Sequence, residues 1–124
     1  MSLLKPVGIA LMSSTLFFCS LLLTGISTAL AADEATIAEG KKIAFDRKKG
    51  NCLACHMIAD GALPGNIGPP LIAMKARFPD LAKLRAQIWD ARSKNPNTIM
   101  PPFGTNKIIT PEEVDKVAAY IHSL

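Results

Sequence analysis

Three residues that lie close together in the sequence could do chemistry: Cys52, Cys55 and His56, in the pattern C-x-x-C-H. Two thiols at this spacing can add across the two vinyl groups of a haem, and the imidazole that follows is then brought beneath the iron as an axial ligand. Moving the histidine or reversing the order would break this geometry. The pattern therefore predicts one covalently attached haem c.

Three other interpretations of the same pattern explain less of it. A structural zinc site needs further ligands, and the only other histidine is His122. A thioredoxin-like pair would follow a strand in a βαβ unit, and no segment here has the period of two that a strand requires. A simple disulfide between Cys52 and Cys55 leaves the adjacent histidine unexplained.

The second axial position of the iron needs a ligand from elsewhere in the chain, and methionine is the usual partner of histidine. Met57 adjoins His56 and cannot reach around the ring, while Met74 falls on or near a helix and is expected in the core. The segment between His56 and Met100 is long enough to wrap around the haem, and the two prolines that follow Met100 stiffen the backbone there. We predict Met100 as the ligand, with open coordination or another ligand as the alternatives. Closed His/Met coordination favours electron transfer over chemistry at the iron.

Two residues are candidates to support the haem and its ligands. A ligating imidazole normally donates its other N–H to an oxygen, and the carbonyl of Pro69, in the Gly68-Pro69 pair, is the candidate acceptor. A plain turn explains that pair almost as well. Trp89 could donate its indole N–H to a haem propionate, although a tryptophan at helical spacing is more often in a core or an interface.

The elements that must position these residues are helices and long loops. An amphipathic helix is expected over residues 35–48, ending near Gly50, and a second follows Asp80 through about residue 93, with Leu81, Leu84 and Ile88 on its apolar face. Residues 57–71 are rich in glycine and proline and are expected to be a loop. The fold class that results is all-α.

The closing helix has the clearest start signal. Thr110 is its expected N-cap, Pro111 its first residue and Glu113 the partner that completes a capping box. We also expect Gly40 and Tyr120 to mark a close crossing of the first and last helices, and His122 to be solvated near the helix end.

The N-terminal segment is typical of a secretory signal peptide. Lys5 is its single charge, an apolar stretch follows, and small residues end it at Ala29-x-Ala31. We predict a signal peptide over residues 1–31, cleaved after Ala31 or Ala32, and a domain over 32–124 that works in the periplasm. An uncleaved membrane anchor is the less favoured alternative. A lipoprotein leader is not expected, because the bulky residues Phe17 and Phe18 precede Cys19.

The net charge gives no reason to expect a nucleic-acid partner. It is +4 for the whole chain and, with the single charge of the leader removed, about +3 for the mature domain, which is too mild a basic balance for nucleic-acid binding.

The attachment motif, Gly68-Pro69 and the later methionine resemble class I cytochromes c. Four segments also resemble the SoxX family, the monohaem subunits of the SoxAX cytochromes of thiosulfate oxidation: GNCLACH, PGNIGPPL, QIWD and NPNTIMPPFG, at residues 50–56, 64–71, 87–90 and 95–104.

That narrower resemblance implies a function and a set of partners. A SoxA-like subunit would catalyse the oxidative coupling of thiosulfate to a cysteine of the SoxYZ carrier. This chain would take up the electrons in a heterodimer with SoxA and relay them to a small soluble cytochrome c. Because its domain has no cysteine besides Cys52 and Cys55, it fits the electron-transfer subunit and not the catalytic one.

The haem edge of such a subunit should carry an apolar surface that faces the partner, around Ile67, Ile99 and Phe103. Two other functions stay open from the residues alone. One is a free-standing electron carrier for another redox enzyme, and the other is a haem enzyme or gas sensor with an exchangeable distal ligand.

Overall fold

The computed structural model of the chain describes residues 24–124, with side chains described from Glu34 onward. Most of the expected signal peptide, residues 1–31, lies outside the described residues, so its cleavage stays a prediction. Among the helices that are described, none is both long enough and apolar enough to cross a membrane.

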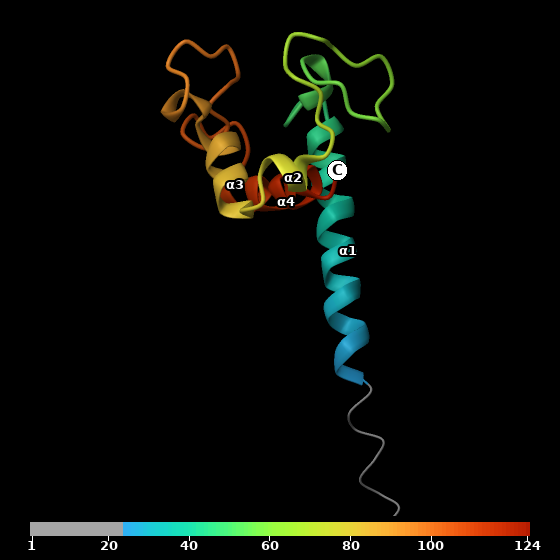
Figure 1. Ribbon diagram of the computed structural model, residues 1–124. Coiled ribbons are helices and arrows are strands. Elements are labelled where there is room, and N and C mark those ends of the chain that lie inside the picture. Colours follow the sequence, from blue (N-terminus) through green and yellow to red (C-terminus); the bar gives the residue numbers. More distant parts are fainter. Residues whose placement is uncertain (1–23) are drawn as a thin grey trace, which may run out of the picture.

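Four α-helices and two short 3-10 helices make up the described chain. In order they are α1 (Thr24–Phe45), η1 (Cys52–Ala54), α2 (Met74–Arg77), α3 (Leu81–Trp89), η2 (Ala91–Ser93) and α4 (Pro111–His122). Residues 24–124 contain no strand, and the predicted all-α class is confirmed. In Figure 1 one group of loops rises beyond the end of α1 and another beyond the end of α3.

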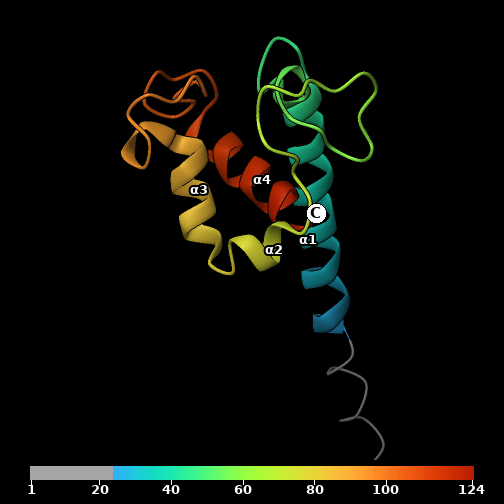
Figure 2. The ribbon, with the colours of Figure 1, turned by 45° about the horizontal axis from the view of Figure 1, so that its top comes forward.

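The helix α4 packs against both α1 and α3 and holds the two sides of the molecule together (Figure 2). Gly40 of α1 is buried where the helices cross, and a Cβ placed there would lie 2.0 Å from the carbonyl oxygen of Lys116. The ring of Phe45 meets that of Tyr120 edge to face, with 6.0 Å between centroids. The predicted close crossing at Gly40 and Tyr120 is confirmed.

The first helix differs from its expected bounds at both ends. It begins at Thr24 instead of residue 35, and so runs across the predicted cleavage site. It ends at Phe45 because the chain turns back on itself over residues 46–50, where the N–H of Gly50 donates to the carbonyl of Ile43 at 3.1 Å. A Cβ on Gly50 would lie 2.7 Å from that same carbonyl oxygen, so only glycine fits this turn without a shift of the backbone.

The helix α3 is shorter than expected and its apolar face is narrower. Its N-cap is Asp80, whose carboxylate accepts from the N–H of Ala82 at 2.8 Å. It stops at Trp89, since Asp90 is extended (φ −156°) and starts η2. Leu84 and Ile88 are buried as predicted, whereas Leu81 is 43 % exposed, so its assignment to the apolar face was wrong.

The closing helix begins as the sequence predicts. The Thr110 hydroxyl accepts from the N–H of Glu113 at 3.2 Å, and the Glu113 carboxylate accepts from the N–H of Thr110 at 3.0 Å. Near its end, His122 is half-buried and its Nε2 donates to the carbonyl of Phe78 at 3.0 Å. The expectation that His122 is merely solvated was therefore wrong, because this contact ties α4 to the turn before α3.

Candidate haem site

A cavity of about 540 Å³ lies between the loops that follow α1, the loops that follow α3, and the faces of α3 and α4 beneath them. This volume is typical of cavities that hold a cofactor or a drug-sized ligand. Its walls are mainly apolar and include Leu71, Met74, Phe78, Leu84, Ile88, Phe103, Ile109, Val117 and Ile121. The cavity can therefore bury a flat, largely apolar group.

The C-x-x-C-H motif forms one wall of this cavity. Cys52 opens η1 after Asn51, which has a left-handed backbone (φ 46°), and the N–H of His56 donates to the carbonyl of Cys52 at 2.9 Å. This turn brings Cys52, Cys55 and His56 to the same cavity. Burial raises the pKa of the Cys52 thiol to about 11, and both cysteines are free of any disulfide.

The His56 imidazole is held by the loop that follows it. Its Nδ1 lies 2.7 Å from the carbonyl oxygen of Pro69, the acceptor expected from the sequence. Gly68 packs directly on the ring, since a Cβ there would lie 2.5 Å from Cε1 and 2.6 Å from Nδ1. A carbonyl can only accept, so Nδ1 carries the proton and Nε2 keeps its lone pair for a metal.

Met100 lines the same cavity from the loops that follow α3. Its N–H donates to the Thr98 hydroxyl at 3.2 Å. Met57 is 45 % exposed and does not line the cavity, and Met74 is a buried core residue, 2 % exposed, at the edge of the cavity. The fold thus brings together His56 and Met100, which lie far apart in the sequence.

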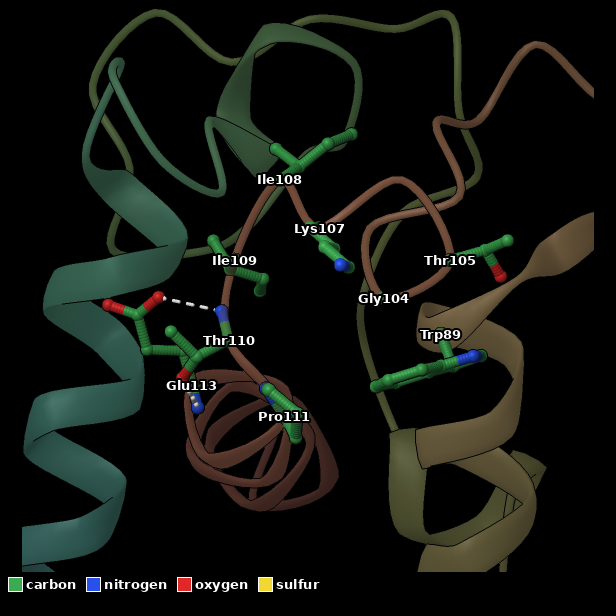
Figure 3. Close-up of a pocket in the computed structure, with 9 residues that line it drawn as sticks. All are labelled: Trp89, Gly104, Thr105, Lys107, Ile108, Ile109, Thr110, Pro111 and Glu113. Carbon is green, nitrogen blue, oxygen red and sulfur yellow. Dashed lines mark hydrogen bonds between the residues drawn. The ribbon is translucent and has the colours of Figure 1, made fainter.

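Trp89 is not among the residues that line the haem cavity. It borders a second pocket of about 510 Å³ next to the start of α4 (Figure 3). There its ring lies flat beneath Gly104 (Figure 3), and the guanidinium carbon of Arg85 is 5.1 Å from the ring centroid. The structure supports the packing interpretation of Trp89 and does not bring it to the cavity where a propionate contact would be needed.

Several cavity residues were missed by sequence reasoning. Arg47, Lys48 and Lys49 line it just before the motif, and Gln87 and Arg77 line it from the helices. The three consecutive basic residues beside the motif were a visible signal that was not used. For Arg77 there was no signal, because its role follows from a hydrogen bond of Nη1 to the carbonyl of Pro70 at 2.7 Å, which braces the loop that holds His56.

An all-α domain with a C-x-x-C-H wall and a methionine at the same apolar cavity is the arrangement of a c-type cytochrome. Residues 37–124 match the cytochrome c family, and the chain belongs to that family. The chain is also 36 % identical over 99 residues to a protein of Aquifex aeolicus (strain VF5) named "Uncharacterized lipoprotein". That alignment covers 79 % of this chain and 47 % of the relative, so the chain spans about half the relative's length.

Membership of this family makes the protein an electron-transfer haem protein whose cofactor is covalently bound haem c. The residues present fit that group. The cavity is apolar and offers two thiols, an oriented imidazole and a thioether. When bound, the haem supplies an iron that exchanges one electron at a time, while the chain supplies its attachment, its ligands and its exclusion from water.

Proposed function

We propose that this cytochrome c carries one haem, attached through Cys52 and Cys55 and ligated by His56 and Met100, and that it relays electrons in the periplasm. The observation that carries the proposal is that His56, oriented by Pro69, and Met100 line one cavity. With both axial positions filled, the iron has no open site for a substrate. The thioether ligand raises the reduction potential of the iron relative to His/His ligation, and burial in an apolar pocket raises this potential further.

The particular role that we propose is that of the SoxX-like subunit of a SoxAX-like complex. The carrier thiol and thiosulfate would be joined by a new S–S bond on the SoxA-like partner, which gives an S-thiosulfonate, one proton and two electrons. This chain would receive the electrons one at a time and pass each to a small soluble cytochrome c. The four segments that resemble SoxX support this role, as does the lack of a cysteine in the domain besides Cys52 and Cys55.

The surface around the cavity supports a docking role. Ile67 and Ile99 line the cavity from its two sides and are 64 % and 76 % exposed, and Ile108, also lining it, is 40 % exposed. Exposed apolar side chains on opposite edges of one opening are suited to contact with a partner. Phe103, which was expected to share this surface, is only 8 % exposed and belongs to the core, so that expectation was wrong.

Co-expression with a SoxA-like chain tests the role directly. We expect the two chains to co-purify, and Ile67→Asp and Ile99→Asp to weaken the complex by at least tenfold, since each places a charge in an apolar contact. Leu63→Asp is the matched control, because Leu63 is 95 % exposed in the same loop as Ile67 but does not line the cavity. A chain that stays monomeric in the mixture would favour a free-standing carrier for another enzyme.

The N-terminus of the exported protein is the remaining part of the proposal. Cleavage after Ala31 or Ala32 would release the domain into the periplasm. The name of the Aquifex relative gives a second possibility, an acyl group on Cys19 that anchors the chain to a membrane. Mass spectrometry of the protein purified from the exporting cell separates the two, since one form begins at residue 32 or 33 and the other at an acylated Cys19.

A further inference from the structure

The loop that carries Met100 is fastened to the end of α3 by residues that do not line the haem cavity themselves. We call residues 94–109 the methionine loop. The N–H of Gly104 donates to the carbonyl of Trp89 at 3.0 Å. A Cβ on Gly104 would lie 2.0 Å from Cδ2 of Trp89 and 2.1 Å from Cε3, so the loop backbone rests directly on the indole (Figure 3).

A second contact fastens the next residue of the loop. The Thr105 hydroxyl donates to the Asp90 carboxylate at 3.0 Å. Arg92 holds the same carboxylate in a forked contact, at 2.8 Å from Nε and 2.6 Å from Nη2. Arg92 and the Thr105 hydroxyl hold the pKa of Asp90 well below its usual range, so the acceptor is charged at any ordinary pH. A charged acceptor makes this a stronger hydrogen bond than a neutral pair.

The chain between this fastening and Met100 is short and stiff. Pro101 and Pro102 have fixed φ angles, and Phe103 is buried in the core at 8 % exposure. The carbonyl of Phe103 accepts from the N–H of Ile108 at 2.9 Å, which closes the loop on itself. Because no flexible residue lies between them, we expect a displacement of Gly104 or Thr105 to move Met100 as well.

We propose that Trp89 and Asp90 are positioning residues for the Met100 ligand: they latch the methionine loop to α3 and set how often the thioether leaves the iron. The inference rests on the proposed His56/Met100 ligation. His56 adjoins Cys55 and is held wherever the haem is attached. Met100 has no covalent link to the haem and depends on its loop, so a loosened latch raises the population of protein with an open iron.

Two variants of the holoprotein loosen the latch in different ways. Thr105→Val keeps the shape of the side chain and removes the hydroxyl, and Gly104→Ala places a methyl where the Trp89 ring lies. The loss of this exposed hydrogen bond to a charged acceptor predicts about a tenfold rise in the open population. Carbon monoxide binds the ferrous protein only in the open form, so its binding rate should rise by the same factor. The far-red absorption band of thioether-bound ferric haem should fall.

Variants at Trp89 and a distant control separate positioning from general stability. Trp89→Phe keeps a flat ring beneath Gly104 and should behave like the wild type, whereas Trp89→Leu should behave like Gly104→Ala. Lys116→Gln removes the exposed contact with Glu39 between α1 and α4 and leaves the latch intact. We expect it to lower the urea midpoint of the helical signal without changing the carbon monoxide rate.

The outcomes distinguish the hypothesis that Trp89 and Asp90 position the methionine loop from the hypothesis that Met100 binds the iron. If Met100→Ala leaves the far-red band and the carbon monoxide rate unchanged, the ligation itself is wrong. If Met100→Ala opens the iron while Thr105→Val and Gly104→Ala bind carbon monoxide at the wild-type rate, the latch is wrong and the ligation stands. The latch is also wrong if Lys116→Gln accelerates carbon monoxide binding as much as Thr105→Val does.

Discussion

The carbonyl of Pro69 accepts a hydrogen bond from Nδ1 of His56 at 2.7 Å, and this contact fixes both the tautomer and the orientation of the imidazole. With the ring proton on Nδ1, Nε2 keeps a free lone pair that can bind a metal. The hydrogen bond also couples the ligand to the loop of residues 64–71, which Arg77 braces through the carbonyl of Pro70. The proximal side of the site is thus held by the backbone of a loop, which a side-chain deletion at Pro69 would not remove.

Gly68→Ala tests this proximal support. The new methyl would lie 2.5 Å from the His56 ring, so either the imidazole or the loop must move. We expect a lower yield of the haem-loaded protein and a stability loss of about 1–3 kcal/mol, the usual cost of overpacking. Chemical denaturation and the haem absorption spectrum measure the two effects. Asn66→Ala, at an exposed position of the same loop, should leave both unchanged.

The covalent attachment gives a prediction about mass. The purified protein should be heavier than its polypeptide by one haem, and the haem should stay with the chain after acid unfolding, because thioether bonds survive denaturation. In the Cys52→Ser/Cys55→Ser double variant any bound haem should be extracted. Release of the haem from the wild-type protein would contradict the attachment through these two cysteines.

The sequence predicted those parts of the fold that are determined by local signals. The capping box of Thr110 and Glu113 and the buried positions Leu84 and Ile88 follow from spacing alone. The cavity that unites the motif with Met100 does not follow from spacing, because it depends on how α4 packs between α1 and α3.

Two residues show what spacing could not reveal. Leu81 has the helical spacing of a core residue, yet it lies in the first turn of α3 and stays 43 % exposed. For Trp89 the sequence favoured a packing role over a propionate contact, and the structure agrees, but the residue that packs on its ring is Gly104, fifteen residues later, which no local pattern names. In both cases the outcome depends on long-range contacts that spacing does not contain.

The crossing of α1 and α4 at Gly40 should tolerate no side chain. A Cβ at this position would meet the backbone carbonyl of Lys116 at 2.0 Å, and backbone atoms of a packed helix cannot swing away. We expect Gly40→Ala to lower the free energy of unfolding by about 1–3 kcal/mol despite the better helix propensity of alanine. Ala38→Ser, on an exposed part of α1, is the control and should change stability by less than about 0.5 kcal/mol.

The ion pair between Lys116 and Glu39 predicts a dependence of stability on pH. The hydrogen bond and charge of Lys116 lower the pKa of Glu39 below its ordinary value of 4.5. A lowered folded-state pKa contributes stability above the unfolded value and loses it as the pH falls through the folded value. The difference in unfolding free energy between wild type and Lys116→Gln should therefore be constant at neutral pH, shrink as the pH falls below the ordinary pKa of 4.5, and vanish only below the lowered pKa of the folded state. A difference that grows on acidification would contradict this sign.

Replacement of Met100 decides whether the iron is closed. In Met100→Ala the cavity keeps its walls and its attachment residues but loses the only methionine contributed by the loops after α3. We expect rapid carbon monoxide binding to the ferrous protein, at least about tenfold faster than in the wild type, as expected when a minor open state becomes the main one.

Met74→Leu is the matched control, because Met74 lines the same cavity from α2 as a core residue that is 2 % exposed. It should leave the haem spectrum unchanged and cost less than about 1.5 kcal/mol, as a volume-conserving exchange. If Met74→Leu opens the iron and Met100→Ala does not, the sixth ligand comes from α2. Rapid carbon monoxide binding by the wild type itself would instead favour a sensor or an enzyme over an electron carrier.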